Sequence, residues 1–160
     1  MSELRMRRAA RALVLDPEGR VLLVRFEFPD DMALWAMPGG GVDEGESHGE
    51  AIVRELAEEV GLASFEPGPW IWHREHVFPF YGGGWDGQIE ETMLVRVPAF
   101  EPAPRFTLEE LAAEYVTAVR WWTQEELAAS GERFAPRRLP ELVVELLRDG
   151  PPADLVDIGV

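Results

Sequence analysis

Three carboxylates are crowded at the end of the helix predicted between Ser47 and Gly61. Glu55, Glu58 and Glu59 share an arc of about 100° when each residue advances by about 100°. Glu55 and Glu59 are like charges at i and i+4, which destabilises an isolated helix, and the helix dipole disfavours anions at this end. Such a cluster is typical of a solvated acidic face or of a site for a hard divalent cation such as Mg²⁺.

The boundaries of this helix are marked in the sequence. Ser47 and Glu50 form a capping box, in which each side chain accepts a hydrogen bond from the other residue's amide. Gly61 can adopt the left-handed conformation that ends a helix. Apolar residues recur at i, i+4 and i+8 and predict one buried stripe, Ile52, Leu56 and Val60. The sequence therefore predicts an amphipathic helix with the carboxylates beside its buried stripe.

The spacing of the residues around the helix favours the cation site. Nine of them fit the pattern G-x5-E-x7-R-E-U-x-E-E-x-G-U, where U is a bulky aliphatic residue: Gly40, Glu46, Arg54, Glu55, Leu56, Glu58, Glu59, Gly61 and Leu62. This stretch, residues 40–62, resembles the Nudix box of the Nudix hydrolases, and all nine defined positions are filled.

The resemblance implies a role for each polar residue of the box. Mg²⁺, or Mn²⁺ in its place, would be held by one backbone carbonyl and three carboxylates: Gly39, Glu55, Glu58 and Glu59. Glu55 and Glu58 would also act in catalysis, and which carboxylate is the base stays open. Arg54 would orient a carboxylate, and Glu46 would pair with Arg54 or support it.

A further glutamate from outside the box is also implied by the resemblance. Glu114 is the first choice because it comes shortly before the segment Arg120-Trp121-Trp122. Glu110 and Glu91 are the alternatives. Each of the three also fits a solvated surface acid, which is the common role of an isolated glutamate.

Other side chains are candidates for substrate contacts. Arg25 lies on a predicted strand, where it can point toward an anion or to solvent. Trp35 and Trp85 are candidates for stacking against a nucleotide base, although most aromatic residues of a domain belong to its core. Specificity is expected to lie in three segments: 28–35, 81–88 and 105–117.

Composition narrows the classes of protein that fit. A chain of 160 residues suits one domain, 1–160, with its core at about 9–147. There is no cysteine for a disulfide or a thiolate site, and no apolar run reaches the length of about 18 residues that a membrane span needs. The net charge of −15 argues against nonspecific binding of nucleic acid. We expect a cytoplasmic protein that binds neither nucleic acid nor membrane.

Strand-like and helical segments alternate irregularly, which predicts an α/β or α+β fold. The segments with strand composition are 9–16, 20–28, 70–80, 89–97 and 118–122, the first two as a hairpin. Three helices are predicted. One spans 107–115, one begins at the capping box of Thr123 and Glu126, and one spans 140–148. The glycines of 39–41 predict a sharp turn that approaches a ligand, or a plain turn. The resemblance implies an α/β/α sandwich with a mixed sheet.

These observations favour a Mg²⁺-dependent hydrolase that cleaves the diphosphate linkage of a nucleoside diphosphate bound to another group. A nucleotide-binding regulatory module without turnover is the alternative, although such a module has no need of the acidic set. A prenyl-diphosphate isomerase is a third reading, which the lack of cysteine makes hard to support. The resemblance also allows a homodimer.

Overall fold

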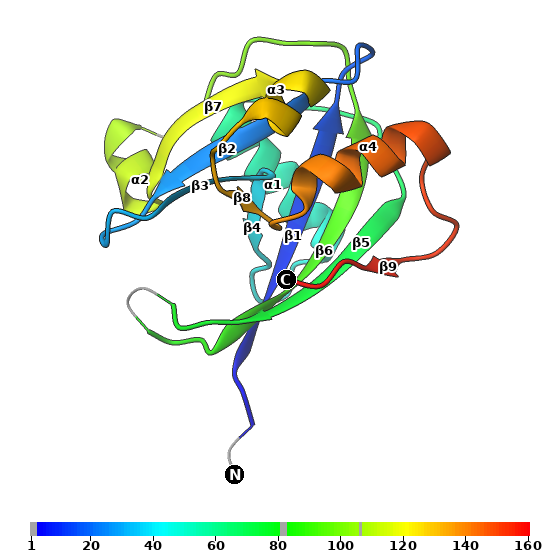
Figure 1. Ribbon diagram of the computed structural model, residues 1–160. Coiled ribbons are helices and arrows are strands. Elements are labelled where there is room, and N and C mark those ends of the chain that lie inside the picture. The colour runs from blue at the N-terminus through cyan, green and yellow to red at the C-terminus, as the bar shows by residue number, and fades with distance from the viewer. Residues whose placement is uncertain (1–2, 81–82, 106) are drawn as a thin grey trace.

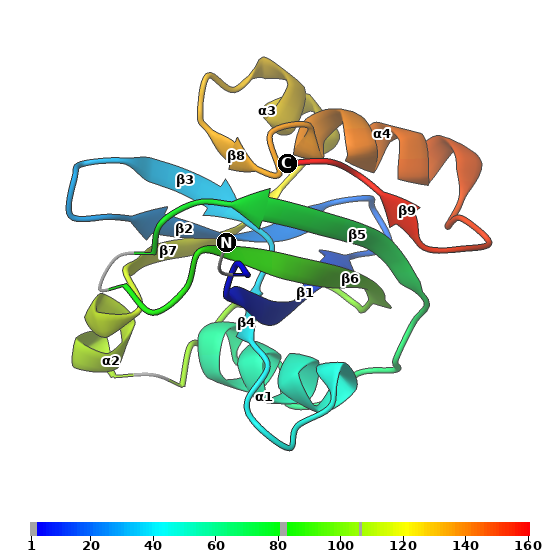
Figure 2. The same ribbon diagram turned by 90° about the horizontal axis from the view of Figure 1, so that it is seen from below.

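A curled mixed β-sheet forms the middle layer of the protein, and helices cover both of its faces (Figure 1). The computed structural model describes residues 3–80, 83–105 and 107–160. Seen from below, α1 (His48–Val60) lies on one face, and α3 (Gln124–Ala129) and α4 (Leu139–Asp149) lie on the other (Figure 2). The remaining helix, α2 (Leu108–Ala113), lies beside β7. The mixed α/β fold predicted from the sequence is therefore confirmed.

The sheet follows the order β8-β3-β2-β1-β6-β5-β9, with β4 added to β1 and β7 added to β2. Its strands are β1 (Met6–Leu15), β2 (Val21–Glu27), β3 (Ala33–Ala36), β4 (Gly39–Gly41), β5 (Trp70–Val77), β6 (Gly87–Arg96), β7 (Val116–Trp122), β8 (Phe134–Ala135) and β9 (Val156–Asp157). The five predicted strands are all present. The sequence did not predict β3, β4, β8 and β9, because strands of two to four residues are too short to show a period-2 pattern.

The predicted hairpin of the first two strands is reduced to a single pair of residues. β1 and β2 are antiparallel neighbours only at Leu15 and Val21. One edge of β1 pairs in parallel with β6 over its whole length, and β4 occupies the other edge at residues 9–11. β2 therefore pairs mainly with β3 and β7.

Two apolar cores lie on the two faces of the sheet, because successive side chains of a strand point to opposite sides. The core under α1 joins β1 to the predicted stripe of the helix: Ala10, Ala12, Val14, Ile52, Leu56 and Val60. The core under α4 joins the other residues of β1 to that helix: Leu13, Leu15, Leu139, Leu142, Val143 and Leu146. Full burial of each Ile, Leu or Val side chain contributes about 1.5–3 kcal/mol, so the stripe of three holds α1 against the sheet.

The predicted ends of α1 are confirmed. Ser47 Oγ accepts a hydrogen bond from the Glu50 amide at 3.1 Å, and Glu50 Oε1 accepts one from the Ser47 amide at 3.0 Å. Gly61 ends the helix in the left-handed conformation, with φ at 77°. The capping box of Thr123 and Glu126 is likewise present at the start of α3.

Parts of two segments predicted to set specificity fall outside the described residues. Tyr81 and Gly82 belong to the loop 81–88, and Phe106 belongs to the segment 105–117. Within the described ranges, no helix combines the length and the apolar character needed to cross a membrane.

Candidate active site

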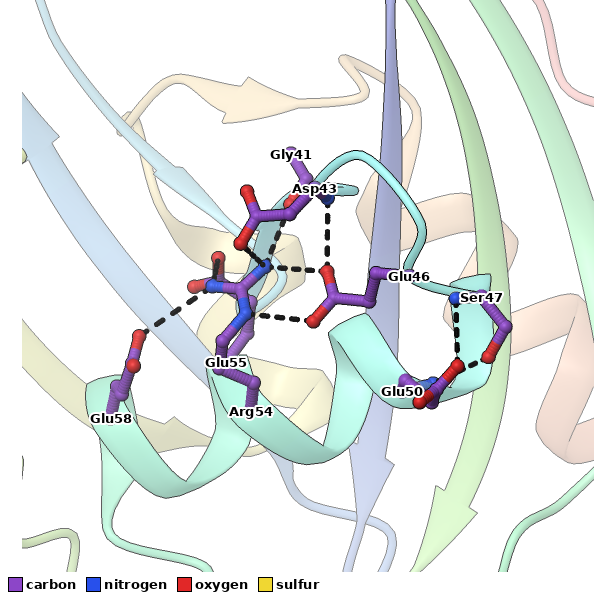
Figure 3. Close-up of polar contacts among 8 residues, drawn as sticks. All are labelled: Gly41, Asp43, Glu46, Ser47, Glu50, Arg54, Glu55 and Glu58. Carbon is purple, nitrogen blue, oxygen red and sulfur yellow. Dashed lines mark hydrogen bonds and ion pairs between the residues drawn. The ribbon is translucent and has the colours of Figure 1, made fainter.

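Arg54 lies at the centre of a web of hydrogen bonds between α1 and the loop before it (Figure 3). Its Nε and Nη2 donate to the Glu46 carboxylate at 3.0 and 2.9 Å, and Nη2 also donates to the Gly41 carbonyl oxygen at 2.9 Å. Its Nη1 donates to Glu55 Oε1 at 2.8 Å. The bidentate hydrogen bond from Arg54 lowers the pKa of Glu46 to about 2, so Glu46 is ionised at neutral pH. The structure places Glu46 and Arg54 in the contact that their predicted roles require.

Glu59 is buried against the strand that precedes the helix. Its side chain is among the buried polar groups, with only 4 % of the residue exposed. Oε1 accepts a hydrogen bond from the Gly39 amide at 2.8 Å. Burial and the neighbouring Glu55 raise the pKa of Glu59 to about 8, because the charged form loses hydration and faces a like charge. Glu59 is therefore a carboxylate that needs a proton or a cation close to it.

The three glycines form the strand β4 rather than the predicted turn. They pair antiparallel with β1, with Gly40 opposite Ala10. A Cβ on Gly39 would lie 2.1 Å from the Ala10 carbonyl oxygen, and its φ of 142° is rarely adopted by other residues. A Cβ on Gly40 would lie 2.7 Å from Glu55 Oε1. The glycines thus let the carboxylates of α1 approach the backbone of the sheet.

Glu55 and Glu58 differ from Glu59 in their exposure. The side chain of Glu55 is 13 % exposed and that of Glu58 is 36 % exposed. Burial raises the pKa of Glu55, and the hydrogen bond from Arg54 opposes part of this shift. Glu58 Oε2 lies 3.6 Å from Arg54 Nη1. The three carboxylates therefore range from buried to water-accessible along one side of the helix.

The carboxylate oxygens of Glu55, Glu58 and Glu59 and the Gly39 carbonyl oxygen are of the chemical type that binds a divalent cation, although they do not surround one point. Within the described residues, no three acidic or histidine side chains stand in the arrangement of a metal site. Carboxylate and carbonyl oxygens are the ligands that Mg²⁺ prefers. Burial is the main cause of the raised pKa of Glu59, and repulsion from Glu55 adds to it, so a cation near Glu59 would favour its charged form. The Gly39 carbonyl accepts a hydrogen bond from Arg11 at 3.0 Å and keeps a second lone pair.

The three candidates for the extra glutamate have different surroundings. Glu114 interacts electrostatically with Glu59, whose pKa it helps to raise. Glu110 caps α2, since its Oε1 accepts a hydrogen bond from the Thr107 amide at 3.1 Å. Glu91 lies 3.7 Å from His73 Nδ1 on the neighbouring strand. Of the three, Glu114 is the one whose charge acts on Glu59, and it stays the first choice.

Of the predicted substrate contacts, Trp35 is corrected by the structure. Trp35 is 6 % exposed and belongs to the core under α4, where its ring meets the edge of Trp122 at 5.1 Å between centroids. A base cannot stack on a ring packed in this way. Trp85 is 42 % exposed and stays a prediction. Arg25 donates to Glu27 at 3.0 Å and to Thr117 at 2.8 Å, so its guanidinium is already partnered.

Two of the segments predicted to set specificity meet at one cavity. It has a volume of about 620 Å³ and lies between the end of β2 and α2. Phe28 and Asp31 line it from the first segment, and Leu111 and Tyr115 line it from the other. Tyr115 directly follows Glu114, which places this cavity next to the candidate extra glutamate.

Sequence reasoning missed a buried polar cluster on the α4 face of β1, β5 and β6. Its members are Arg7, Arg11, Arg74, Gln88 and Glu90. Glu90 joins them, since it accepts hydrogen bonds from Arg74 at 2.9 Å and from Gln88 at 2.8 Å and lies 3.7 Å from Arg11. One signal was available: Arg7 and Arg11 share the strand face of the apolar Leu13 and Leu15, where charge is unusual.

A curled mixed sheet between two helical layers, with the carboxylates of α1 held against a glycine strand, defines a Nudix-type α/β/α fold. The family model described as NUDIX domain matches residues 5–142. The chain therefore belongs to the Nudix hydrolase family, and this match supports its assignment as a Nudix-type pyrophosphohydrolase.

Individual proteins resemble the chain in sequence or in fold. An RNA pyrophosphohydrolase of Novosphingobium aromaticivorans is 30% identical over 145 residues, which are 85% of this chain and 81% of the relative. The MutT protein of Methanosarcina mazei Go1 superposes with a TM-score of 0.67 at 19% identity, covering 93% of this chain and 98% of that one. The Nudix domain of Shewanella oneidensis NrtR, in a complex with ADP-ribose, gives 0.64 at 19% identity and covers 91% and 90%. The two structural likenesses concern the fold.

Proposed function

We propose that this protein hydrolyses the diphosphate linkage of a nucleoside diphosphate bound to another group, with Mg²⁺ as its cofactor and Mn²⁺ as a substitute. The observation that carries the proposal is the contact between Glu59 and the Gly39 amide at 2.8 Å. This contact brings the most buried carboxylate of α1 to the backbone of the glycine strand, while Arg54 holds Glu55 beside it. One helix end thereby presents several oxygen ligands to the same region.

Hydrolysis of a phosphoanhydride needs stabilisation of phosphate charge and a positioned water molecule. A bound divalent cation supplies Lewis-acid stabilisation and lowers the pKa of bound water. In our proposal the cation would be held by the Gly39 carbonyl, by three carboxylates of the box and by one acid from outside it: Glu55, Glu58, Glu59 and Glu114. Glu55 or Glu58 accepts the proton of the attacking water. Arg54 orients Glu55, and Glu46 fixes Arg54 from the other side.

An RNA end is a second candidate for the substrate. The relative from N. aromaticivorans is named for RNA, and the phosphoanhydrides of an RNA lie in a polyphosphate at its 5′ end. Against this reading stands the net charge of −15, because nucleic-acid binding draws much of its affinity from basic surface. A small nucleotide derivative needs a few cationic groups, and so we favour it.

The test is a substrate panel measured with Mg²⁺, with Mn²⁺ and with a chelator. The panel contains ADP-ribose, a nucleotide sugar, a dinucleoside polyphosphate, an oxidised nucleoside triphosphate and an RNA oligonucleotide with a 5′ triphosphate. Release of mononucleotide, phosphate and pyrophosphate is followed for each. We expect metal-dependent cleavage of one small-molecule class. Faster cleavage of the RNA than of every small molecule would make an RNA end the substrate instead. Activity that persists in the presence of the chelator would contradict the proposed role of the metal.

A module that binds a nucleotide without cleaving it is the competing function, and the same panel decides it. Stoichiometric binding of a panel member, with no product after long incubation with Mg²⁺, would favour that module. A homodimer and a cytoplasmic location also stay predictions. Sedimentation equilibrium tests the first, and fractionation of cells that express the chain tests the second.

A further inference from the structure

Four arginines near the candidate active site are engaged with carboxylates. Arg54 donates to Glu46 and Glu55, and Arg25 donates to Glu27. Arg11 and Arg74 share Glu90, at 3.7 and 2.9 Å. The positive charge of a guanidinium held in this way is already balanced by a carboxylate of the protein. Such groups orient the backbone and the neighbouring side chains more readily than they bind a ligand.

Arg7 differs from these four. Among the described residues, no carboxylate forms an ion pair with its guanidinium, and its hydrogen bond to Gln88 Oε1 is long, at 3.4 Å. The guanidinium lies over the Phe80 ring, 5.7 Å from the centroid. Burial lowers the pKa of Arg7, and repulsion from Arg11 adds to this effect. The charge of Arg7 is therefore partly stripped of water and lacks a close anionic partner.

The position of Arg7 joins the polar cluster to the candidate active site. Attraction to Glu114, Glu55 and Glu90 opposes part of the lowering of its pKa, which places the guanidinium within electrostatic range of the box. It also lies directly over Gly41, because a Cβ at that position would be 2.4 Å from Arg7 Nη2. Successive residues of the glycine strand thus meet Glu55 on the α1 face and Arg7 on the α4 face.

The charges of the cluster do not balance on the α4 face. Arg7, Arg11 and Arg74 bring three positive charges, and Glu90 brings one negative charge. Uncompensated charge in a partly buried setting is costly unless a counter-charge arrives. An anion with several acceptor oxygens, such as a phosphate group, matches a guanidinium in geometry as well as in charge. Glu55 and Glu114 attract Arg7, and Glu55 and Glu59 attract Arg11. A divalent cation bound to those carboxylates would therefore leave the positive charge of the two guanidinium groups to attract a phosphate group.

We propose that the Arg7 guanidinium, seated over Gly41, binds a phosphate oxygen of the substrate. This inference rests on the proposed function and deepens it, since it names the group that receives the phosphate chain opposite the glutamates. Gln88 and the Glu90-paired arginines frame Arg7, and Gly41 leaves the space that the guanidinium occupies.

Arg7→Gln and Arg8→Gln form a matched pair for the test. They remove the same charge from neighbouring residues of β1, and the side chain of Arg8 is exposed on the other face of the strand. We expect Arg7→Gln to raise KM for the best panel substrate by about 10- to 100-fold, the loss typical of a hydrogen bond to a charged group. Arg8→Gln should leave KM within about twofold. Equal KM values in the two variants would overturn the proposal.

Gly41→Ala provides a second test that leaves the charge in place. The added Cβ displaces the guanidinium, which is the flexible end of its side chain, and Gly41 is not among the glycines with positive φ. We expect KM to rise in the same direction as in Arg7→Gln while the unfolding midpoint stays near that of the parent chain. Arg7→Lys should raise KM less than Arg7→Gln does, because lysine keeps the positive charge but lacks the planar, bidentate donors of the guanidinium. Full activity in Gly41→Ala with the guanidinium displaced would contradict the proposal.

Calorimetric binding of methylenediphosphonate, a diphosphate analogue that resists hydrolysis, separates this inference from the proposed function. The titration is run with Mg²⁺ on the parent chain, Arg7→Gln and Arg8→Gln. Loss of binding in Arg7→Gln alone supports the phosphate role even if the panel finds no turnover. Equal binding by all three, or none by the parent chain, overturns it even if the panel finds a hydrolase.

Discussion

The two longest helices cover opposite faces of the sheet (Figure 2), and their last turns differ in charge. In α4, Glu141 lies in the first turn, as the helix dipole prefers, and the last turn pairs Arg148 with Asp149. The last turn of α1 contains no basic residue, and it holds Glu58 and Glu59. Both helices bury an apolar stripe, so the difference is confined to their polar sides.

The acidic last turn of α1 is electrostatically unfavourable for the helix itself. An acidic C-terminal turn opposes the dipole and the like-charge rule for i and i+4. The structure offsets these costs by tertiary contacts: Arg54 binds Glu55, and the Gly39 amide binds Glu59. The partners of α4 are local, such as Arg148 with the adjacent Asp149. We therefore regard α4 as a cover for the sheet and α1 as a cover that also carries chemistry.

Truncation of the buried stripes tests whether the two helices are equivalent as covers. Leu56→Ala in α1 and Leu142→Ala in α4 should each lower the free energy of unfolding by about 2–5 kcal/mol, since both leave a cavity in a core. Chemical denaturation measures the loss. The exposed Val53→Ala and Val144→Ala serve as controls and should change stability by about 0.5 kcal/mol or less. A loss below about 1 kcal/mol in either leucine variant would break the equivalence.

Neutralising a glutamate in each helix tests where the chemistry lies. Glu55→Gln should lower kcat on the best panel substrate by about 100-fold or more, because it removes a proposed cation ligand and catalytic group. Glu145→Gln in α4, where the side chain is 50 % exposed, should leave kcat unchanged. Initial rates at saturating substrate and Mg²⁺ provide the measurement. If Glu55→Gln kept its rate within twofold, the acidic end of α1 would be a solvated face.

The pH dependence of stability tests the cost of the buried carboxylate. The pKa of Glu59 is about 8 in the folded protein and 4.5 for a free side chain. The unfolded chain therefore releases this proton first, and the free energy of unfolding falls as pH rises from about 4.5 to 8. Glu59→Gln removes this dependence and should stabilise the metal-free protein at pH 8 by an amount on the order of 1–3 kcal/mol.

Thermal unfolding of both proteins between pH 5 and 9 gives the measurement. With Mg²⁺ added, the parent chain should gain more stability than Glu59→Gln, because the cation replaces the missing proton. Parallel pH curves for the two proteins in the absence of metal would show that Glu59 carries no such cost.

The smallest effect concerns the starts of the two helices. Ser47→Ala removes the side chain that caps α1 and should cost about 1 kcal/mol. At α4 the N-cap residue is Arg138, which makes no side-chain capping bond. Arg138→Ala should therefore change the free energy of unfolding by about 0.5 kcal/mol or less. Equal losses in the two variants would mean that the capping box contributes nothing of its own.

Local signals predicted much of the fold because they act over short distances. The Ser47 and Glu50 capping box, Gly61 and the apolar stripe fixed α1 at the positions seen in the structure. The strands of four residues or fewer escaped prediction, since their partners supply the reason to be extended. The glycine strand is the clearest case: its pairing with Ala9 to Arg11 of β1 cannot be inferred from three glycines in a row.

The candidate site divides in the same way. The box places its glutamates on one helix face, and Arg54 contacts Glu46 and the Glu55 carboxylate, as the resemblance implies. The position of Trp35 next to the glycines predicts a stacking platform, but its ring packs against Trp122 in the core. Arg7 went unnoticed because the groups around it come from distant segments.

The sequence by itself determined which residues form α1, where that helix begins and ends, and which of its faces is acidic. The tertiary structure decided which acid is buried and which arginine lacks a close counter-charge. Desolvation and ion pairing depend on segments far apart in the chain: Gly39 meets Glu59 across 20 residues, and Arg7 meets Gln88 across 81. A pattern of residue types cannot contain those distances, because they arise only when the sheet closes.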